Sequence, residues 1–456
     1  TFNSTNALSY STPVSINSGA TLNANGTSPA YTQTAGTLTV NGSLTANAIS
    51  LQGTSTTQGT GTITGPTTIA SGASVAPGNS AGILNTGNVT FSSGSTFSTE
   101  INAFTTAGTD YDQLNVTGTV SLGNATLNLS GSLAAIPTTA IVIINNDGSD
   151  AVTGTFNGLP EGATMLLNGY TLAVSYVGGD GNDVVLLGAD TEISLDGSGN
   201  LVVSDFAATT NDNITIKSDT TSNVFIITDP GRILLTTIAG ATGSGTDTVT
   251  VPFSAVTGAN IFVNTLAGND SLTVDFSLGN FGKTLTYNGD TQSTSDSLTL
   301  TGGGTFASVS HTLTNANDGS INVTGNSAIN YTGLEPITDN LSAIDRVFSF
   351  NGGDEVISLI DASGSNMTID STLSESVTFK NPNGSLTINA GTGGDTVNVA
   401  GVDAAFSGAL TINGDAGSDN VNFPTNAITL GSSLAVSAEN VSITQAVTAD
   451  SATITS

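Results

Sequence analysis

The residues best suited to chemistry are aspartates in a short unit, Gly-x-Asp-x-apolar, that recurs along the chain. Its two fullest copies lie within Ile388–Phe423, where Asp395 and Asp419 are 24 positions apart. Further copies begin at Gly181, Gly245, Gly268 and Gly352. Aspartate, asparagine and turn carbonyls supply the oxygen ligands that calcium prefers, and glycine permits the tight turn that gathers them. The sequence therefore predicts calcium at one or more turns, with six candidate ligands: Asp180, Asp183, Asp270, Asp395, Asp415 and Asp419.

The same aspartates also have a structural interpretation. Aspartate and asparagine side chains accept hydrogen bonds from backbone N–H groups in tight turns, which requires no metal. The pairs Asp415 with Asp419 and Asp180 with Asp183 favour a cation, because two carboxylates at one turn repel each other unless they are neutralised. Both interpretations stay open on the sequence alone.

Short strands must position these turns. Each copy of the unit is followed by apolar residues at every second place, Val397 and Val399 after the first and Val421 and Phe423 after the second, as in a strand with one buried face. One such unit cannot bury its apolar face alone, but stacked units can. The fold class expected is all-β, a parallel β-helix (solenoid), with β-sandwich modules as the alternative for the C-terminal half. Threonine and asparagine on the outer faces are expected to form ladders between neighbouring strands.

The charge balance excludes several classes of partner. Five Lys and Arg face 35 Asp and Glu, for a net charge of −30. A chain this acidic does not neutralise a phosphate backbone, so neither nucleic acid nor an anionic membrane surface is expected as a partner. Divalent cations are the natural counterions. The chain has no cysteine, which is compatible with export, and it has no apolar run long enough to be inserted in a membrane as a helix.

A family resemblance appears in the first half of the chain. The run Pro77-Gly78-Asn79-Ser80-Ala81-Gly82, together with Tyr111–Leu133 and Thr155–Leu186, resembles the autotransporter-associated β-strand repeat of large secreted bacterial surface proteins. The resemblance covers roughly residues 36–187. It implies a right-handed parallel β-helix on an exported protein, and it implies no catalytic residues. The stretch Gly178–Leu186 also resembles the nonapeptide of calcium-binding RTX repeats.

Composition divides the chain into three expected parts. Residues 1–95 read as neutral β-helix repeats, 96–190 as a module resembling the end of the autotransporter-associated repeat, and 191–456 as an acidic solenoid with Asp/Gly turns. A further break is expected near 336–345, where Pro336 interrupts the pattern. Because the first residue is Thr, the chain is expected to be a processed product or a fragment.

Little in the sequence points to catalysis. The local cluster Asp110, Tyr111 and Asp112 is interpreted as a turn at a strand edge. The single histidine, His311, lies in an alternating run and is interpreted as an outward-facing surface residue, and no nucleophile elbow accompanies it. The basic residues are scattered, and there is no tryptophan to form a sugar platform. We therefore expect no enzymatic activity.

The expected function is that of an exported bacterial cell-surface structural protein, stabilised by cations. It would be a building block of a surface layer, filament or stalk, or an adhesin, and would associate with itself or with other cell-surface components. The alternative is a carbohydrate-active β-helix enzyme or a polysaccharide-binding module. A sugar site would gather aromatic and basic residues on neighbouring strands, and this sequence does not gather them.

Overall fold

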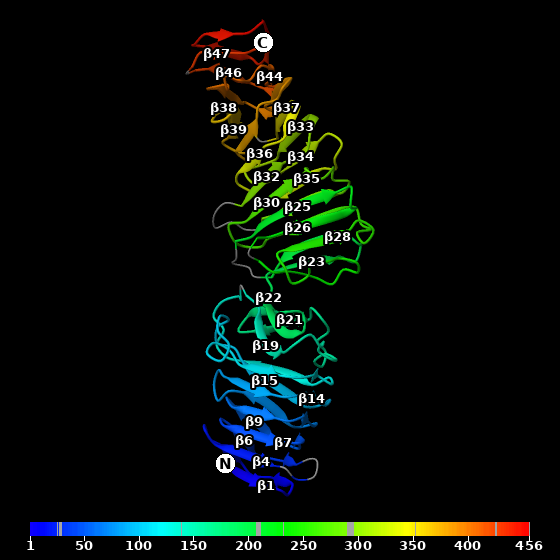
Figure 1. Ribbon diagram of the computed structural model, residues 1–456. Coiled ribbons are helices and arrows are strands. Elements are labelled where there is room, and N and C mark those ends of the chain that lie inside the picture. The colour runs from blue at the N-terminus through cyan, green and yellow to red at the C-terminus, as the bar shows by residue number, and fades with distance from the viewer. Residues whose placement is uncertain are drawn as a thin grey trace. The chain divides into compact units, whose positions relative to one another are not determined.

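The computed structural model describes residues 1–456 except 25, 27–29, 138, 207–210, 231, 290–295, 352, 425 and 456. The described residues form strands and turns and contain no helix (Figure 1). The predicted all-β class is therefore confirmed. Contacts within the chain define two compact units, Thr1–Asp190 and Thr191–Ser456. Gly352, which begins one copy of the aspartate unit, lies outside the described residues.

In the first unit the chain passes through three sheets in turn, and strands three apart in sequence are parallel neighbours up to β19. The ten-stranded sheet contains β1 (Phe2–Ser4), β4 (Thr21–Ala24), β7 (Ser43–Ala46), β10 (Thr62–Thr64), β13 (Ile83–Thr86), β16 (Gln113–Val116), β19 (Ile141–Asn146), β22 (Asp183–Gly188), β21 (Tyr170–Gly178) and β20 (Thr164–Leu167). One six-stranded sheet contains β17 (Val120–Ser121), β14 (Val89–Phe91), β11 (Thr67–Ile69), β8 (Ile49–Leu51), β5 (Tyr31–Gln33) and β2 (Leu8–Tyr10). The other contains β18 (Thr126–Ser130), β15 (Thr96–Glu100), β12 (Ser74–Pro77), β9 (Thr56–Gly59), β6 (Thr37–Val40) and β3 (Val14–Ile16).

The second unit is built on two long sheets, in which parallel pairs alternate with antiparallel hairpins. The thirteen-stranded sheet contains β27 (Leu234–Thr236), β23 (Thr191–Leu195), β24 (Leu201–Asp205), β29 (Asn260–Asn264), β31 (Thr284–Asn288), β35 (Ile329–Thr332), β34 (Gly319–Val323), β33 (Thr305–Leu313), β37 (Ser342–Phe350), β41 (Ser385–Asn389), β44 (Ala409–Asn413), β48 (Ser433–Ser437) and β51 (Ser451–Thr455). The twelve-stranded sheet contains β28 (Thr248–Pro252), β26 (Val224–Thr228), β25 (Asn213–Asp219), β30 (Ser271–Asp275), β32 (Ser297–Thr301), β36 (Ile337–Asp339), β40 (Val377–Lys380), β39 (Asn366–Ser371), β38 (Val356–Ala362), β43 (Thr396–Val399), β46 (Asn420–Phe423) and β49 (Asn440–Ile443). Short pairs join β42 (Thr392–Gly393) to β45 (Ala416–Gly417) and β47 (Ile428–Thr429) to β50 (Val447–Thr448).

Alternation of apolar and polar residues builds the core of each unit. Val397 and Val421 are register partners on β43 and β46, and both are buried. Val399 and Phe423, two places further along the same strands, are completely buried. The predicted inward positions are thus confirmed. Burial of side chains this size supplies most of the favourable free energy of folding.

Polar ladders run along the outside of the strands, as expected. In the ten-stranded sheet the Asn145 side chain donates to Asn115 at 3.3 Å, and Asn115 donates to Asn85 at 3.2 Å. In the second unit Asn413 donates to Asn389 at 2.8 Å. These hydrogen bonds between asparagine side chains hold parallel strands in register, because a shift of one residue would break all of them.

Candidate functional site

An acidic residue stands directly before many strands of the twelve-stranded sheet. We call these residues the acidic edge: Asp212, Asp270, Asp296, Glu355, Asp395, Asp419 and Glu439. They stack at one edge because β25, β30 and β32 are consecutive parallel neighbours, and so are β38, β43, β46 and β49. All except the exposed Glu439 are at most 2% exposed.

Backbone amides bind the carboxylates of the acidic edge. Each bond runs from the N–H of one acidic residue to the carboxylate of the next residue in the stack. The donor–acceptor pairs are Asp212 to Asp270 (2.8 Å), Asp270 to Asp296 (2.8 Å), Glu355 to Asp395 (2.9 Å), Asp395 to Asp419 (3.0 Å) and Asp419 to Glu439 (2.9 Å). Five of the seven acids therefore satisfy an N–H that precedes a neighbouring strand and that would be costly to leave unpaired.

Burial makes two of these carboxylates, those of Asp270 and Asp395, harder to ionise. Desolvation raises the pKa of Asp395, and the nearby charges of Asp419 and Asp354 raise it further. Desolvation likewise raises the pKa of Asp270. Within the described residues, Oδ2 of Asp395 and Oδ2 of Asp419 are buried and have no hydrogen-bond partner. In both Asp395 and Asp419, one buried carboxylate oxygen thus accepts a hydrogen bond and, among the described residues, the other does not. The surrounding protein interior is less polar than water, which disfavours the charged form.

The structure separates the six predicted calcium ligands. Asp270, Asp395 and Asp419 belong to the acidic edge, whereas Asp415 lies in an exposed turn with φ of 66°. In the first unit Asp183 is buried and accepts the Asn146 N–H at 2.8 Å.

Asp180, by contrast, is exposed. Desolvation is the main cause of the raised pKa of Asp183, and the charge of Asp180 adds to it. The four buried aspartates accept backbone N–H groups, as the structural interpretation expects. Over the described residues, no group of three or more acidic or histidine side chains is arranged to hold a metal ion. Calcium at these turns stays a prediction.

The two glutamates of this edge, Glu355 and Glu439, lie outside the Gly-x-Asp pattern of the sequence. The copy starting at Gly352 places its aspartate at Asp354, yet Glu355 occupies the position equivalent to Asp395, because Ile357 pairs with Val397. The copy is therefore offset by one residue, and Val356 is exposed while Ile357 is buried. The better signal is an acid immediately before an alternating run, a rule that also finds Glu439.

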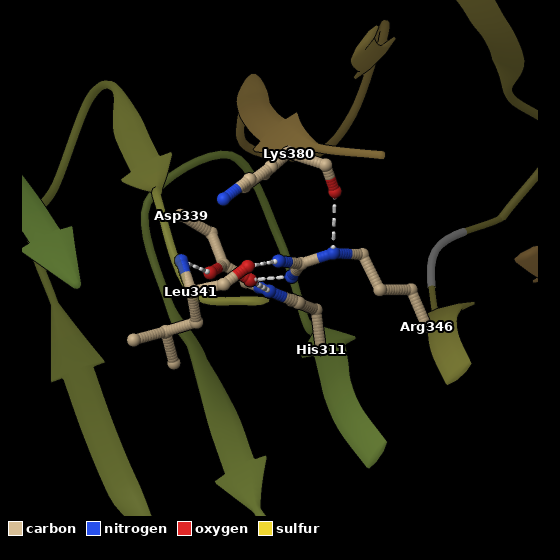
Figure 2. Close-up of polar contacts among 5 residues, drawn as sticks. All are labelled: His311, Asp339, Leu341, Arg346 and Lys380. Carbon is tan, nitrogen blue, oxygen red and sulfur yellow. Dashed lines mark hydrogen bonds and ion pairs between the residues drawn. The ribbon is translucent and has the colours of Figure 1, made fainter. Parts of the chain in front are cut away.

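A second constellation joins three completely buried ionisable side chains, His311 on β33, Asp339 on β36 and Arg346 on β37 (Figure 2). His311 Nε2 lies 3.0 Å from Asp339 Oδ2, and Arg346 Nη1 donates to the same oxygen. Asp339 Oδ1 accepts the Leu341 N–H at 3.0 Å. Arg346 also donates to the carbonyl oxygens of Leu341 and Lys380, as Figure 2 shows.

The prediction of an outward-facing His311 is wrong. Val309, His311 and Leu313 lie at alternate positions of β33 and all point into the core. The His311 ring stacks on Phe348 with ring centres 4.9 Å apart. Because strand parity alone places His311 with Val309 and Leu313, the sequence did carry the signal.

Neighbouring charges decide the ionisation of Asp339 in this buried triad. Burial alone would raise the pKa of Asp339, but the Arg346 guanidinium and His311 together hold that pKa below its usual value. Asp339 and Arg346 therefore form an ion pair inside the core. All three side chains have no exposed surface, so a substrate has no access to them. Such pairs can specify which strands pack together.

Of the cluster Asp110, Tyr111 and Asp112, Asp112 lines a pocket in the first unit. The Asp112 carboxylate accepts N–H bonds from Gly82 and Glu100, both at 2.9 Å, and burial raises its pKa to about 6. Asp110 is partly exposed, and the hydrogen bond that it accepts from the Thr105 hydroxyl is the main cause of its lowered pKa. The pocket encloses about 190 Å³ and its polar lining includes Gln58, Ser80, Ser98, Glu100, Asp112 and Ser130.

Comparison with protein-family models, with curated proteins and with solved structures finds no match for this chain. Among the residues that the structure describes, none belongs to a helix that could cross a bilayer.

Proposed function

We propose that this chain is a structural protein of a bacterial cell surface and that each of its units is a β-solenoid. The observation that carries the proposal is the stacking in the first unit, where each strand pairs in parallel with the strand three places later through three sheets. A chain that coils in this way buries its apolar side chains against the next turn of the coil. We propose a right-handed coil, as the resemblance to autotransporter-associated repeats implies.

The proposed role is mechanical. Within each unit, backbone hydrogen bonds, asparagine ladders and carboxylate-to-amide bonds all connect successive turns of the chain. A mechanical force on such a unit is shared among many hydrogen bonds between successive turns, and these hydrogen bonds form without a cofactor. Such a unit suits a surface layer, a filament, a stalk or an adhesin that associates with itself or with other cell-surface components, and we propose no enzymatic activity.

Cations are the proposed counterions of the acidic second half. The net charge of −30 favours association with divalent cations over self-association without them. We propose that calcium, bound at exposed turns such as that of Asp415 or between neighbouring molecules, supports assembly outside the cell.

Immunogold electron microscopy of intact cells tests the proposal. We expect label on the outer surface in a lattice, in fibres or in spikes, and loss of order after washing with a chelator but not with sodium chloride of equal ionic strength. Permeabilised cells provide the control for antibody access. Label confined to permeabilised cells would place the protein inside and contradict the proposal.

A polysaccharide-binding module is the second candidate, and the pocket beside Asp112 favours it. Its lining offers hydroxyl, amide and carboxylate groups, which match the donors and acceptors of a neutral sugar. Asp112 is a poor general acid because it is nearly buried and both its oxygens accept N–H bonds. Glycan-array binding that Ser98→Ala removes, and that Ser15→Ala leaves intact, would support a binding module. Absence of binding to neutral glycans would exclude this candidate.

A further inference from the structure

Glu375 is a buried acid two residues before β40. It is 1% exposed. Within the described residues neither of its carboxylate oxygens has a hydrogen-bond partner. This distinguishes it from Asp395 and Asp419 of the acidic edge, whose carboxylates accept hydrogen bonds from backbone N–H groups. An ionised carboxylate in such a place would lack both water and a counter-charge.

The groups that face Glu375 come from several elements, and they are acidic. The charges of Glu335, before β36, and of Asp318, before β34, act on it directly. The charges of Glu375 and Asp318 also act on the Tyr331 hydroxyl, on β35, which is buried and has no hydrogen-bond partner among the described residues. It lies against Gly319, where a side chain would leave it no room. Ser374, the residue before Glu375, donates a hydrogen bond to Glu355, which precedes β38, and Ser371 on β39 does the same.

No basic side chain is left to neutralise Glu375. Each of the five has a partner elsewhere: Lys217 with Asp275, Arg232 with the Asn211 carbonyl, Lys283 with the Gly258 carbonyl, Arg346 with Asp339, and Lys380 with Ser342. Neutralisation of Glu375 must therefore come from a proton or from a solvent cation.

We propose that Glu375 carries a proton at neutral pH and that loss of this proton loosens the packing of β36 and β40. The neutral acid tolerates burial and can exchange hydrogen bonds with a phenol such as Tyr331. The ionised form would repel Glu335 and Asp318 across the interior and would draw in water. A cavity of about 300 Å³, lined by Glu335, Asp370, Ser371, Ser374 and Ser376 among others, adjoins this region and gives that water a route. Protonation of Glu375 thus controls how tightly β36 and β40 pack in the second unit.

The direction of the pH effect follows from linkage. Burial, with Glu335 and Asp318 adding to it, raises the pKa of Glu375 from 4.5 to about 9. Because the folded value exceeds the unfolded one, the stabilisation is complete below pH 4.5 and is lost as the pH rises through about 9. Between these values the equilibrium constant for local opening should increase about tenfold per pH unit.

Hydrogen exchange of the full chain, analysed by mass spectrometry between pH 6 and 9 in chelator, tests the proposal. The exchange rate of wild-type peptides that cover β36 and β40, divided by the intrinsic exchange rate, reports the equilibrium constant for local opening. This constant should increase about tenfold per pH unit. Glu375→Gln should abolish this dependence, because the amide is neutral at every pH. Glu439→Gln is the matched control, since that glutamate also precedes a strand of the twelve-stranded sheet but is exposed, and should behave as wild type.

Two results would overturn the proposal. One is opening in the wild type that does not change with pH. The other is protection that calcium increases in the wild type but not in Glu375→Gln, which would mean that an ionised Glu375 holds a cation. If Glu375→Gln does not fold, infrared spectra of wild type labelled with ¹³C-glutamate decide instead. A protonated-carboxyl band at pH 7 that disappears as the pH passes about 9 supports the proposal, and absence of that band refutes it.

Discussion

Removal of the buried guanidinium at position 346 is the sharpest test of the second unit's packing. In Arg346→Met the chain keeps a long side chain but loses the bonds to Asp339 and to the carbonyl oxygens of Leu341 and Lys380. Asp339 then stays buried with His311 and the Leu341 N–H as its partners. Leaving one member of a buried ion pair without the other costs about 3–5 kcal/mol.

The expected loss can be measured as a melting temperature. For a unit of this size, 1 kcal/mol corresponds to about 2–4 °C, so Arg346→Met should lower the melting temperature of the second unit by about 6–20 °C. Differential scanning calorimetry of the full chain reports it. Lys217→Met is the control, because it breaks a partly exposed ion pair with Asp275 that is worth at most about 1 kcal/mol.

A second substitution separates lost charge from lost packing. Arg346→Met with Asp339→Asn removes both charges while the amide oxygen still accepts the Leu341 N–H, so it should recover much of the stability. The single variant should also respond less to acid. Arg346 holds the pKa of Asp339 low, so the wild type gains from this pair above the unfolded pKa and loses that gain as the pH falls through the lower folded value. If Arg346→Met melts like Lys217→Met, the guanidinium is not buried and paired as described.

Two further predictions concern the core and the proposed cations. Phe423→Ala removes a completely buried ring. It should lower the free energy of unfolding of the second unit by about 3–5 kcal/mol, measured by chemical unfolding. A change below about 1 kcal/mol would mean that Phe423 does not face the core. If calcium binds the folded second unit, that unit should melt at a higher temperature in calcium than in chelator, by about 2.7 kcal/mol of added stability at a hundredfold excess over Kd. Asp415→Asn should reduce this difference, and equal melting at matched ionic strength would refute calcium binding.

Local pattern was sufficient for the strands but not for the charged clusters. Alternation identified Val397, Val421 and Phe423 as core positions, because the side chains of a strand alternate between its two faces whatever its neighbours are. The same rule, applied correctly, places His311 inside. The alternation rule cannot tell which residue of a neighbouring strand a given residue pairs with. That pairing depends on the length of every turn and inserted hairpin between the two strands.

The partners of the acidic residues therefore came from tertiary structure. Asp212 and Asp270 are bonded although 58 positions separate them, whereas Asp395 and Asp419 are 24 apart. Between the first two, the hairpin of β26 and β28 lengthens the path without disturbing the stack. The sequence by itself determined the strands, their buried faces and the excess of negative charge. Only the folded chain decided which carboxylates accept a hydrogen bond from a backbone N–H and which one pairs with Arg346. It also decided that Glu375 has no hydrogen-bond partner among the described residues. The reason is that hydrogen bonds and charges act over a few ångströms, between residues that lie far apart in the sequence.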